Sequence, residues 1–126
     1  MRPTHLADAS AWAQLHRNDV AARLVPLLVG GGAATCGLVD LEVLQIFDDP
    51  HERAQVREER RMFPRVEIDD ATLDRALEVQ GLVEGVSVTA LIVAAAAERA
   101  DLVLLHHDEA YETIASVTGQ PTERVG

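Results

Sequence analysis

Short apolar runs alternate along this chain with longer segments in which apolar side chains recur every three or four positions. The short runs predict strands at residues 4–7, 33–36 and 102–105. Residues 65–68 alternate between polar and apolar side chains and predict a further short strand, and residues 122–125 are expected to form a last edge strand. The longer segments predict helices, and they cover residues 18–29, 38–44, 51–62, 73–80, 88–97 and 108–115. With a short helix directly after Asp8, the predicted order of elements is β-α-α-β-α-α-β-α-α-β-α-β. Strands that alternate with helices in this order predict an α/β/α sandwich on a mostly parallel sheet of about four to five strands.

Polar residues precede several of the predicted helices and are candidates for N-caps, whose side chains accept hydrogen bonds from the first free amides of a helix. Either Asn18 or Asp19 is expected to cap the first long helix, and either Asp69 or Asp70 the helix at 73–80. Ser87 is expected to cap the helix that begins after it.

Two segments are apolar enough to belong to the interior. Residues 88–97 are apolar on all sides, as in buried helices. Residues 102–105 are fully apolar, as in an interior strand of a parallel sheet. The lone Cys36 excludes an internal disulfide, and we expect it to be a small buried apolar residue.

Charged residues are frequent in two of the helices. We interpret residues 51–62 as a solvated face, because basic and acidic side chains alternate there, with an RNA-facing patch as the alternative. The basic residues of this segment are Arg53, Arg57, Arg60 and Arg61. In the preceding helix Asp40 is expected to be solvated, whereas Glu42 lies among apolar neighbours. Glu42 is either exposed on an amphipathic helix or buried, and in the second case it needs a partner or a cation.

Polar groups also stand at the ends of two of the predicted strands. Asp8 ends the first strand, and His106, His107 and Asp108 end the apolar strand at 102–105. Open α/β sheets bind ligands at the carboxyl ends of their strands. Asp8 is therefore either a simple N-cap or the first member of a metal-binding acidic cluster. The two adjacent histidines face opposite sides of a strand, and we interpret them as structural.

The composition narrows the class of protein. A chain of 126 residues with 48% hydrophobic content predicts a single domain over residues 1–126. We expect it to be soluble and cytoplasmic, because it has no signal peptide pattern and no apolar run that spans a bilayer. The net charge of −10 opposes nonspecific attraction to nucleic acids, and an aromatic content of 3% argues against base-stacking platforms.

Four segments together resemble a known family. They are residues 6–12 (LADASAW), 38–44 (LVDLEVL), 87–95 (SVTALIVAA) and 104–108 (LLHHD). In this order and spacing the chain resembles PIN-domain ribonucleases, specifically the VapC-type toxins of bacterial toxin–antitoxin pairs. The likeness covers nearly the whole chain and implies a PIN-like α/β/α fold.

The resemblance also implies an activity. In that family, four acids from separate elements hold Mg²⁺ or Mn²⁺ for the hydrolysis of RNA phosphodiester bonds. Three of these positions fall on Asp8, Glu42 and Asp108, and the third of the four falls on Ala90. Ser10 matches the small hydroxyl residue that supports the first acid through a hydrogen bond.

The chain departs from the family pattern in three places. Ala90 removes one ligand, which is expected to weaken binding of one ion and to prevent binding of a second. It is either an inactivating Asp→Ala exchange or a naturally eroded site. The loop at 82–86 is shorter and acidic, and Ala110 replaces a further acid before Tyr111.

The family further implies an RNA substrate, a VapB-like antitoxin that inserts a basic side chain into the acidic pocket, and a homodimer built from helices. The leading hypothesis is a metal-dependent endoribonuclease toxin, impaired by Ala90. The first alternative is a catalytically inactive PIN-like module that binds a partner or regulates a promoter. The second is a flavodoxin-like or nucleotide-binding domain, but the glycines at 30–32 are not followed by Lys-Ser/Thr and are interpreted as a turn.

Overall fold

A five-stranded parallel sheet forms the centre of the molecule. The computed structural model describes residues 2–126. The sheet has the order β3-β2-β1-β4-β5, and every adjacent pair of strands is parallel. The strands are β1 (His5–Ala7), β2 (Ala33–Cys36), β3 (Arg65–Val66), β4 (Val103–His106) and β5 (Thr122–Arg124). The predicted α/β fold with a mostly parallel sheet is confirmed.

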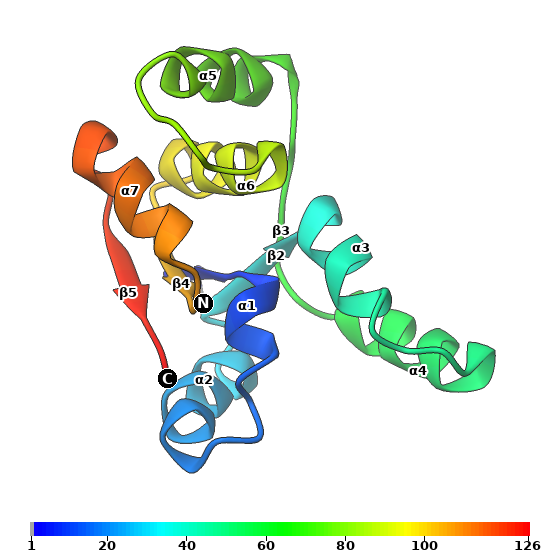
Figure 1. Ribbon diagram of the computed structural model, residues 1–126. Helices are drawn as coiled ribbons and strands as arrows, with labels where there is room; N and C mark the ends of the chain where they lie inside the picture. Colours follow the sequence, from blue (N-terminus) through cyan, green and yellow to red (C-terminus); the bar gives the residue numbers. More distant parts are fainter. Residues whose placement is uncertain (1) are drawn as a thin grey trace.

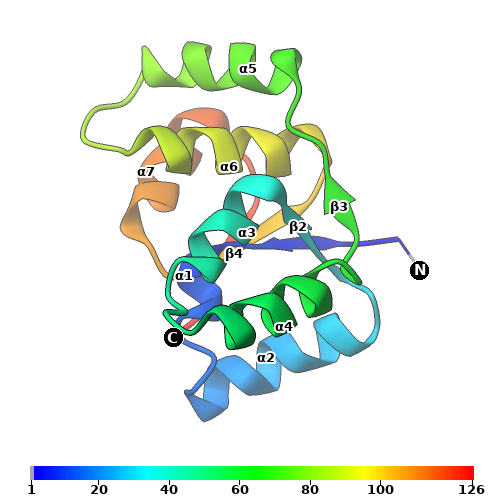
Figure 2. The same ribbon diagram turned by 90° about the vertical axis from the view of Figure 1, so that its right-hand side faces the viewer.

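Seven helices within residues 2–126 connect the strands in the predicted order of elements. They are α1 (Ala9–Trp12), α2 (Asn18–Val29), α3 (Gly37–Leu44), α4 (Pro50–Arg60), α5 (Asp70–Gln80), α6 (Val88–Arg99) and α7 (Glu109–Thr118). Figure 1 shows α5 and α6 on one side of the sheet and α2 on the other. Figure 2 shows α5 lying along α6, and α3 next to α4.

The two faces of the sheet pack into separate apolar clusters, because successive side chains of a strand point to opposite faces. Leu6 and Leu104 pack with α3, α5, α6 and α7. Ala7 and Leu105 pack with α1 and α2 on the other face. All four side chains are fully buried. Both faces are therefore covered, which explains why these strands are apolar without alternation.

Helix α6 is the most buried helix, as its sequence predicts. Its alanines are small enough to let the helix pack closely against both the sheet and α5. Ser87 caps it by accepting a hydrogen bond from the amide of Ala90 at 3.0 Å. Asp69 caps α5 in the same way through the amide of Thr72. The predicted cap of α2 by Asn18 or Asp19 was wrong. The N-cap residue is Arg17, and no side chain within residues 2–126 caps that helix.

The expected solvation of Asp40 and Arg60 was also wrong. Arg60 is only 3% exposed, and its Nε donates to Asp40 Oδ1 at 2.6 Å. Thr35 and Arg65 donate to the same carboxylate at 2.8 and 2.6 Å. The Arg60 guanidinium also lies over the ring of Trp12, 4.7 Å from its centroid. These partners come from β2, β3, α1 and α3, so a solvated face inferred from α4 alone misses them.

The remaining basic residues of α4 agree with the prediction. Arg53, Arg57 and the following Arg61 are exposed. Cys36 is fully buried, as expected, and burial raises the pKa of its thiol. Within residues 2–126, none of the helices has the length and apolar character needed to cross a membrane.

We predict that Arg60→Met lowers the free energy of unfolding by about 2 to 4 kcal/mol. Removing one partner of a buried ion pair leaves the other charge uncompensated, although Arg65 still contacts Asp40 and limits the loss. Urea denaturation measures the change. Arg57→Met is the matched control on the same helix, and as an exposed substitution it should stay within about 0.5 kcal/mol of the parent. Equal effects of the two substitutions would contradict a structural role for the buried pair.

Candidate active site

The residues predicted for the site line one pocket at the carboxyl edge of the sheet. Asp8 comes directly after β1, and Asp108 comes two residues after the end of the neighbouring strand β4. Glu42 reaches the pocket from α3 and Ala90 from the first turn of α6. The cavity measures about 360 Å³. Its other lining residues include Ser10, Trp12, Ser87, Thr89 and Tyr111.

Asp8 is almost fully buried, at 4% exposure, and its carboxylate is bonded on both oxygens. Oδ2 accepts hydrogen bonds from the Ser10 amide at 3.0 Å and from the Ser10 hydroxyl at 2.6 Å. Oδ1 accepts a hydrogen bond from the Tyr111 hydroxyl at 2.8 Å. Asp8 thus caps α1 and also lines the pocket, so the two interpretations of this residue do not exclude each other.

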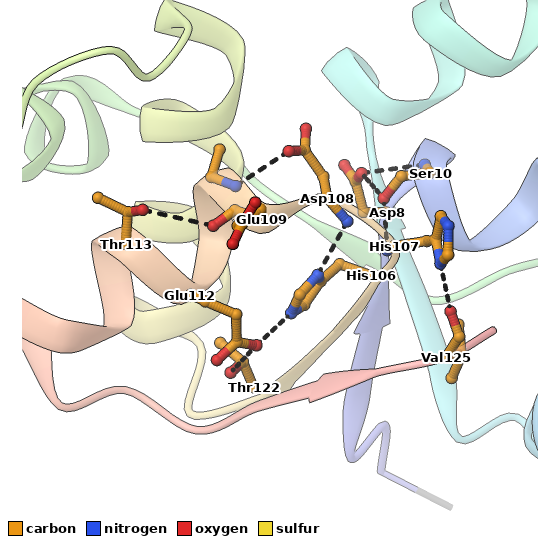
Figure 3. A network of polar contacts seen from close by, with 11 residues as sticks. Asp8, Ser10, His106, His107, Asp108, Glu109, Glu112, Thr113, Thr122 and Val125 are labelled. Atoms are coloured by element: carbon orange, nitrogen blue, oxygen red, sulfur yellow. Dashed lines mark hydrogen bonds and ion pairs between the residues drawn. The ribbon is translucent and has the colours of Figure 1, made fainter.

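Ser10 joins the ends of the two central strands. Its hydroxyl donates to Asp8 and accepts a hydrogen bond from the amide of His107 at 2.9 Å. Figure 3 shows this connection, with Asp8 and Asp108 on the same side of the strand ends. Ser10 therefore orients the Asp8 carboxylate relative to the segment that carries Asp108.

Asp108 begins helix α7 as its N-cap, and its Oδ1 accepts a hydrogen bond from the amide of Ala110 at 3.0 Å. The fully buried His106 supports it, because its Nδ1 accepts a hydrogen bond from the Asp108 amide at 3.1 Å. On its other side, His106 Nε2 lies 2.8 Å from Glu112 Oε1. His107 contacts the carbonyl of Val125 through Nδ1 at 2.8 Å. Neither histidine is among the residues that line the pocket. Figure 3 shows both imidazole rings in contact with other parts of the chain, which agrees with the structural interpretation.

The carboxylates of the pocket influence one another electrostatically. Burial raises the pKa of Glu42, and the negative charges of Asp8 and Asp108 raise it further. The pKa of the Tyr111 hydroxyl lies well above its usual range, first because the group is buried and then because of the Asp8 charge. The phenol therefore remains protonated and acts as a hydrogen-bond donor. A cation in this pocket would relieve the repulsion between the carboxylates.

The fit of a metal ion to these residues is incomplete. Oxygen ligands of this kind suit Mg²⁺ or Mn²⁺. Yet in the described part of the chain, residues 2–126, no three His, Cys, Asp or Glu side chains are grouped closely enough to hold a metal ion. Ala90 is 2% exposed, lines the pocket and contributes no ligand. The pocket thus offers carboxylate oxygens but not a complete set of protein ligands for a metal ion.

Sequence reasoning did not assign Tyr111 to the site, although it noted the residue beside a departure from the family pattern. Its partner Asp8 lies 103 positions away, so no local pattern connects the two residues. Trp12 also lines the pocket, and its buried Nε1 has no hydrogen-bond partner within residues 2–126. Its ring stacks on Phe63, with 5.5 Å between the ring centroids.

Comparison with known families decides the classification. The family model described as PIN domain matches residues 6–117. The chain belongs to the PIN-domain family. The curated relatives of this PIN domain include two proteins from Mycobacterium tuberculosis. Ribonuclease VapC18 is 33% identical over 92% of this chain and 90% of its own length, and ribonuclease VapC21 is 33% identical over 99% and 96%.

Solved structures show the same fold. The VapBC2 complex from Rickettsia felis, bound to a DNA fragment from its promoter, contains a chain that matches this PIN domain with a TM-score of 0.77. The match covers 100% of both chains at 10% identity. A toxin–antitoxin complex from Klebsiella pneumoniae matches with a TM-score of 0.76 at 17% identity, over 98% of this chain and 97% of the other. The resemblance inferred from the sequence is confirmed.

We predict that Glu42→Gln stabilises the PIN domain at pH 7 and has little effect near pH 4. The raised pKa means that the folded state binds the Glu42 proton more tightly than the unfolded state. Glu42 therefore contributes stability below its unfolded pKa, and that contribution is lost as the pH rises through its folded pKa. The expected gain at pH 7 is on the order of 0.5 kcal/mol, because the side chain is partly exposed and screened.

Urea denaturation at both pH values, without divalent ions, measures this difference. Glu58→Gln, on the exposed part of α4, is the control. It should change the free energy of unfolding by the same amount at both pH values. A gain for Glu42→Gln that is the same at pH 4 and pH 7 would contradict a raised pKa for Glu42.

Proposed function

We propose that this PIN domain is a VapC-like endoribonuclease toxin that hydrolyses RNA phosphodiester bonds with Mg²⁺ or Mn²⁺. Asp8 and Asp108 hold the ion, Glu42 reaches it through a water molecule, and Ala90 impairs the activity of this chain. The observation that supports the proposal is the arrival of three carboxylates from separate elements in one pocket at the carboxyl edge of the sheet. Relatives named ribonuclease VapC support the same reaction class.

The hydrogen bonds of Asp8 limit how it binds an ion. A carboxylate has about four acceptor sites, and Ser10 and Tyr111 already use both sites on Oδ2 and one on Oδ1. One acceptor site is left, on Oδ1, so Asp8 binds the ion through that atom alone. Mg²⁺ is commonly held by one or two carboxylates with water and substrate phosphate as further ligands. The remaining acids of this pocket are compatible with that mode.

A bound divalent ion supplies a hydroxide-like nucleophile and a clamp on the phosphate. The chain's own residues hold the carboxylates in position for it. Ser10 fixes Asp8, the cap bond of α7 fixes Asp108, and α3 carries Glu42 to the same pocket. At position 90 the first turn of α6 presents a methyl group where the resemblance places an acid.

The expected partners rest on the same proposal. Structural neighbours that are VapBC complexes support a VapB-like antitoxin. The chain's net charge of −10 and its acidic pocket suit a partner with a basic side chain. We also propose a homodimer built from helices. Apolar side chains on α5 and α6 support it. Leu77 on α5 and Val88 on α6 line the same surface pocket, and they are 64% and 63% exposed.

The second candidate function is a catalytically inactive PIN-like module that binds a partner or regulates a promoter with it. Ala90 and the lack of a three-ligand group in residues 2–126 favour this candidate. It predicts tight binding of a partner protein and no metal-dependent cleavage, whatever residue stands at position 90.

We predict that Ala90→Asp raises Mn²⁺-dependent cleavage of total cellular RNA by about 100-fold or more over the parent chain. Mutating a residue that only supports a metal ligand typically lowers metal affinity or activity about 10- to 100-fold, and the loss of a direct ligand should lower them at least as much. Gel analysis of RNA treated with each protein, with and without EDTA, measures the change.

Two controls accompany this experiment. Ala90→Asn adds a side chain of the same shape as aspartate but without the charge, and its rate of RNA cleavage should stay near that of the parent chain. Asp8→Asn in the Ala90→Asp background should remove the gain. If Ala90→Asp cleaves no RNA although it folds, the nuclease proposal fails and the inactive binding module is favoured.

A further inference from the structure

Tyr111 contacts the Asp8 carboxylate from a distant part of the chain. Its hydroxyl donates to Oδ1 at 2.8 Å from helix α7, whereas the Ser10 bonds to Oδ2 come from the adjacent turn. Tyr111 is 2% exposed and lines the same pocket. The contact therefore lies inside the site and joins the two strand-end segments that carry Asp8 and Asp108.

The position of the ring leaves the hydroxyl little freedom. Tyr111 belongs to the apolar cluster formed with α6, and its ring lies against His106 with 5.2 Å between the centroids. His106 in turn holds the backbone of Asp108. The phenol oxygen is thus placed by the core and not by solvent, so its hydrogen bond to Asp8 has a defined direction.

We propose that Tyr111 is a positioning residue of this site, which holds Asp8 so that the single free acceptor site on Oδ1 is directed into the pocket. The inference rests on the proposed metal-dependent function and deepens it. With Oδ2 fully used by Ser10, a rotation of the Asp8 carboxylate would remove that site from the pocket, and the Tyr111 hydroxyl prevents this rotation. Position 111 therefore matters to ion binding although it provides no ligand.

The test is Tyr111→Phe, which deletes only the hydroxyl and keeps the ring in the core. Mn²⁺ affinity is measured by titration calorimetry in the parent chain and in the Ala90→Asp background. RNA cleavage is measured in the second background. We expect Tyr111→Phe to weaken Mn²⁺ binding about 10-fold in both backgrounds. In the Ala90→Asp background we expect kcat to fall about 10-fold and KM for RNA to stay unchanged. Losses of this size are typical when a group that orients a metal ligand is removed.

Ser116→Ala is the matched control. It deletes a hydroxyl from the same helix that donates to the carbonyl of Thr113, on the exposed side. In each background its Mn²⁺ affinity should equal that of the protein without the substitution, and in the Ala90→Asp background its kcat should also be unchanged. If Ser116→Ala loses as much as Tyr111→Phe, the effect is general destabilisation of α7 and the inference is wrong.

The remaining outcomes separate this inference from the function on which it rests. If Ala90→Asp binds Mn²⁺ and cleaves RNA but Tyr111→Phe leaves affinity and kcat unchanged, or tightens binding, the positioning role fails and the nuclease proposal stands. If Ala90→Asp neither binds Mn²⁺ nor cleaves RNA, both fail.

Discussion

The parallel sheet determines where the chemistry of this molecule lies. β1 is central and pairs with β2 on one side and β4 on the other, so the carboxyl ends of all three strands meet at one edge. The residues just beyond these strand ends therefore come together in one place, however far apart they are in the chain. The Ser10 hydroxyl secures this edge, because it joins Asp8 at the end of β1 to the backbone after β4.

A second polar network holds the wall of the pocket that carries Glu42. Asp40 lies on α3 two positions before Glu42 and is bonded by Arg60, Arg65 and Thr35. The stacked rings of Trp12 and Phe63 lie against the Arg60 guanidinium and join α1 to the same unit. Opposite charges stabilise this side of α3, whereas like charges face one another across the pocket. Ion pairs with Arg60 and Arg65 thus stabilise α3 at Asp40, whereas the charges of Asp8 and Asp108 disfavour the ionised form of Glu42 on the same helix.

The repulsion in the pocket has consequences for both stability and function. The negative charges of Asp8 and Asp108 add to burial in disfavouring the ionised form of Glu42 in the absence of a cation, and binding a divalent ion would offset that cost. At position 90 a buried methyl group lines the pocket, so this position adds no further negative charge to it. The protonated Tyr111 acts in the same direction, because it offers a donor to Asp8 in a pocket lined by acids.

Much of the fold and of the site was predictable from the sequence, because its signals are local. Ser87 and Asp69 accept hydrogen bonds from amides three residues away, so the caps they form are visible in the chain itself. The periodicity of apolar positions likewise predicted the order of strands and helices, and the resemblance indicated which acids share the pocket. Two features were decided only by the tertiary structure: the burial of Arg60 against Asp40, and the bond from Tyr111 to Asp8. Both join residues from separate elements, and such contacts depend on how helices pack on the sheet, which no spacing within one element encodes.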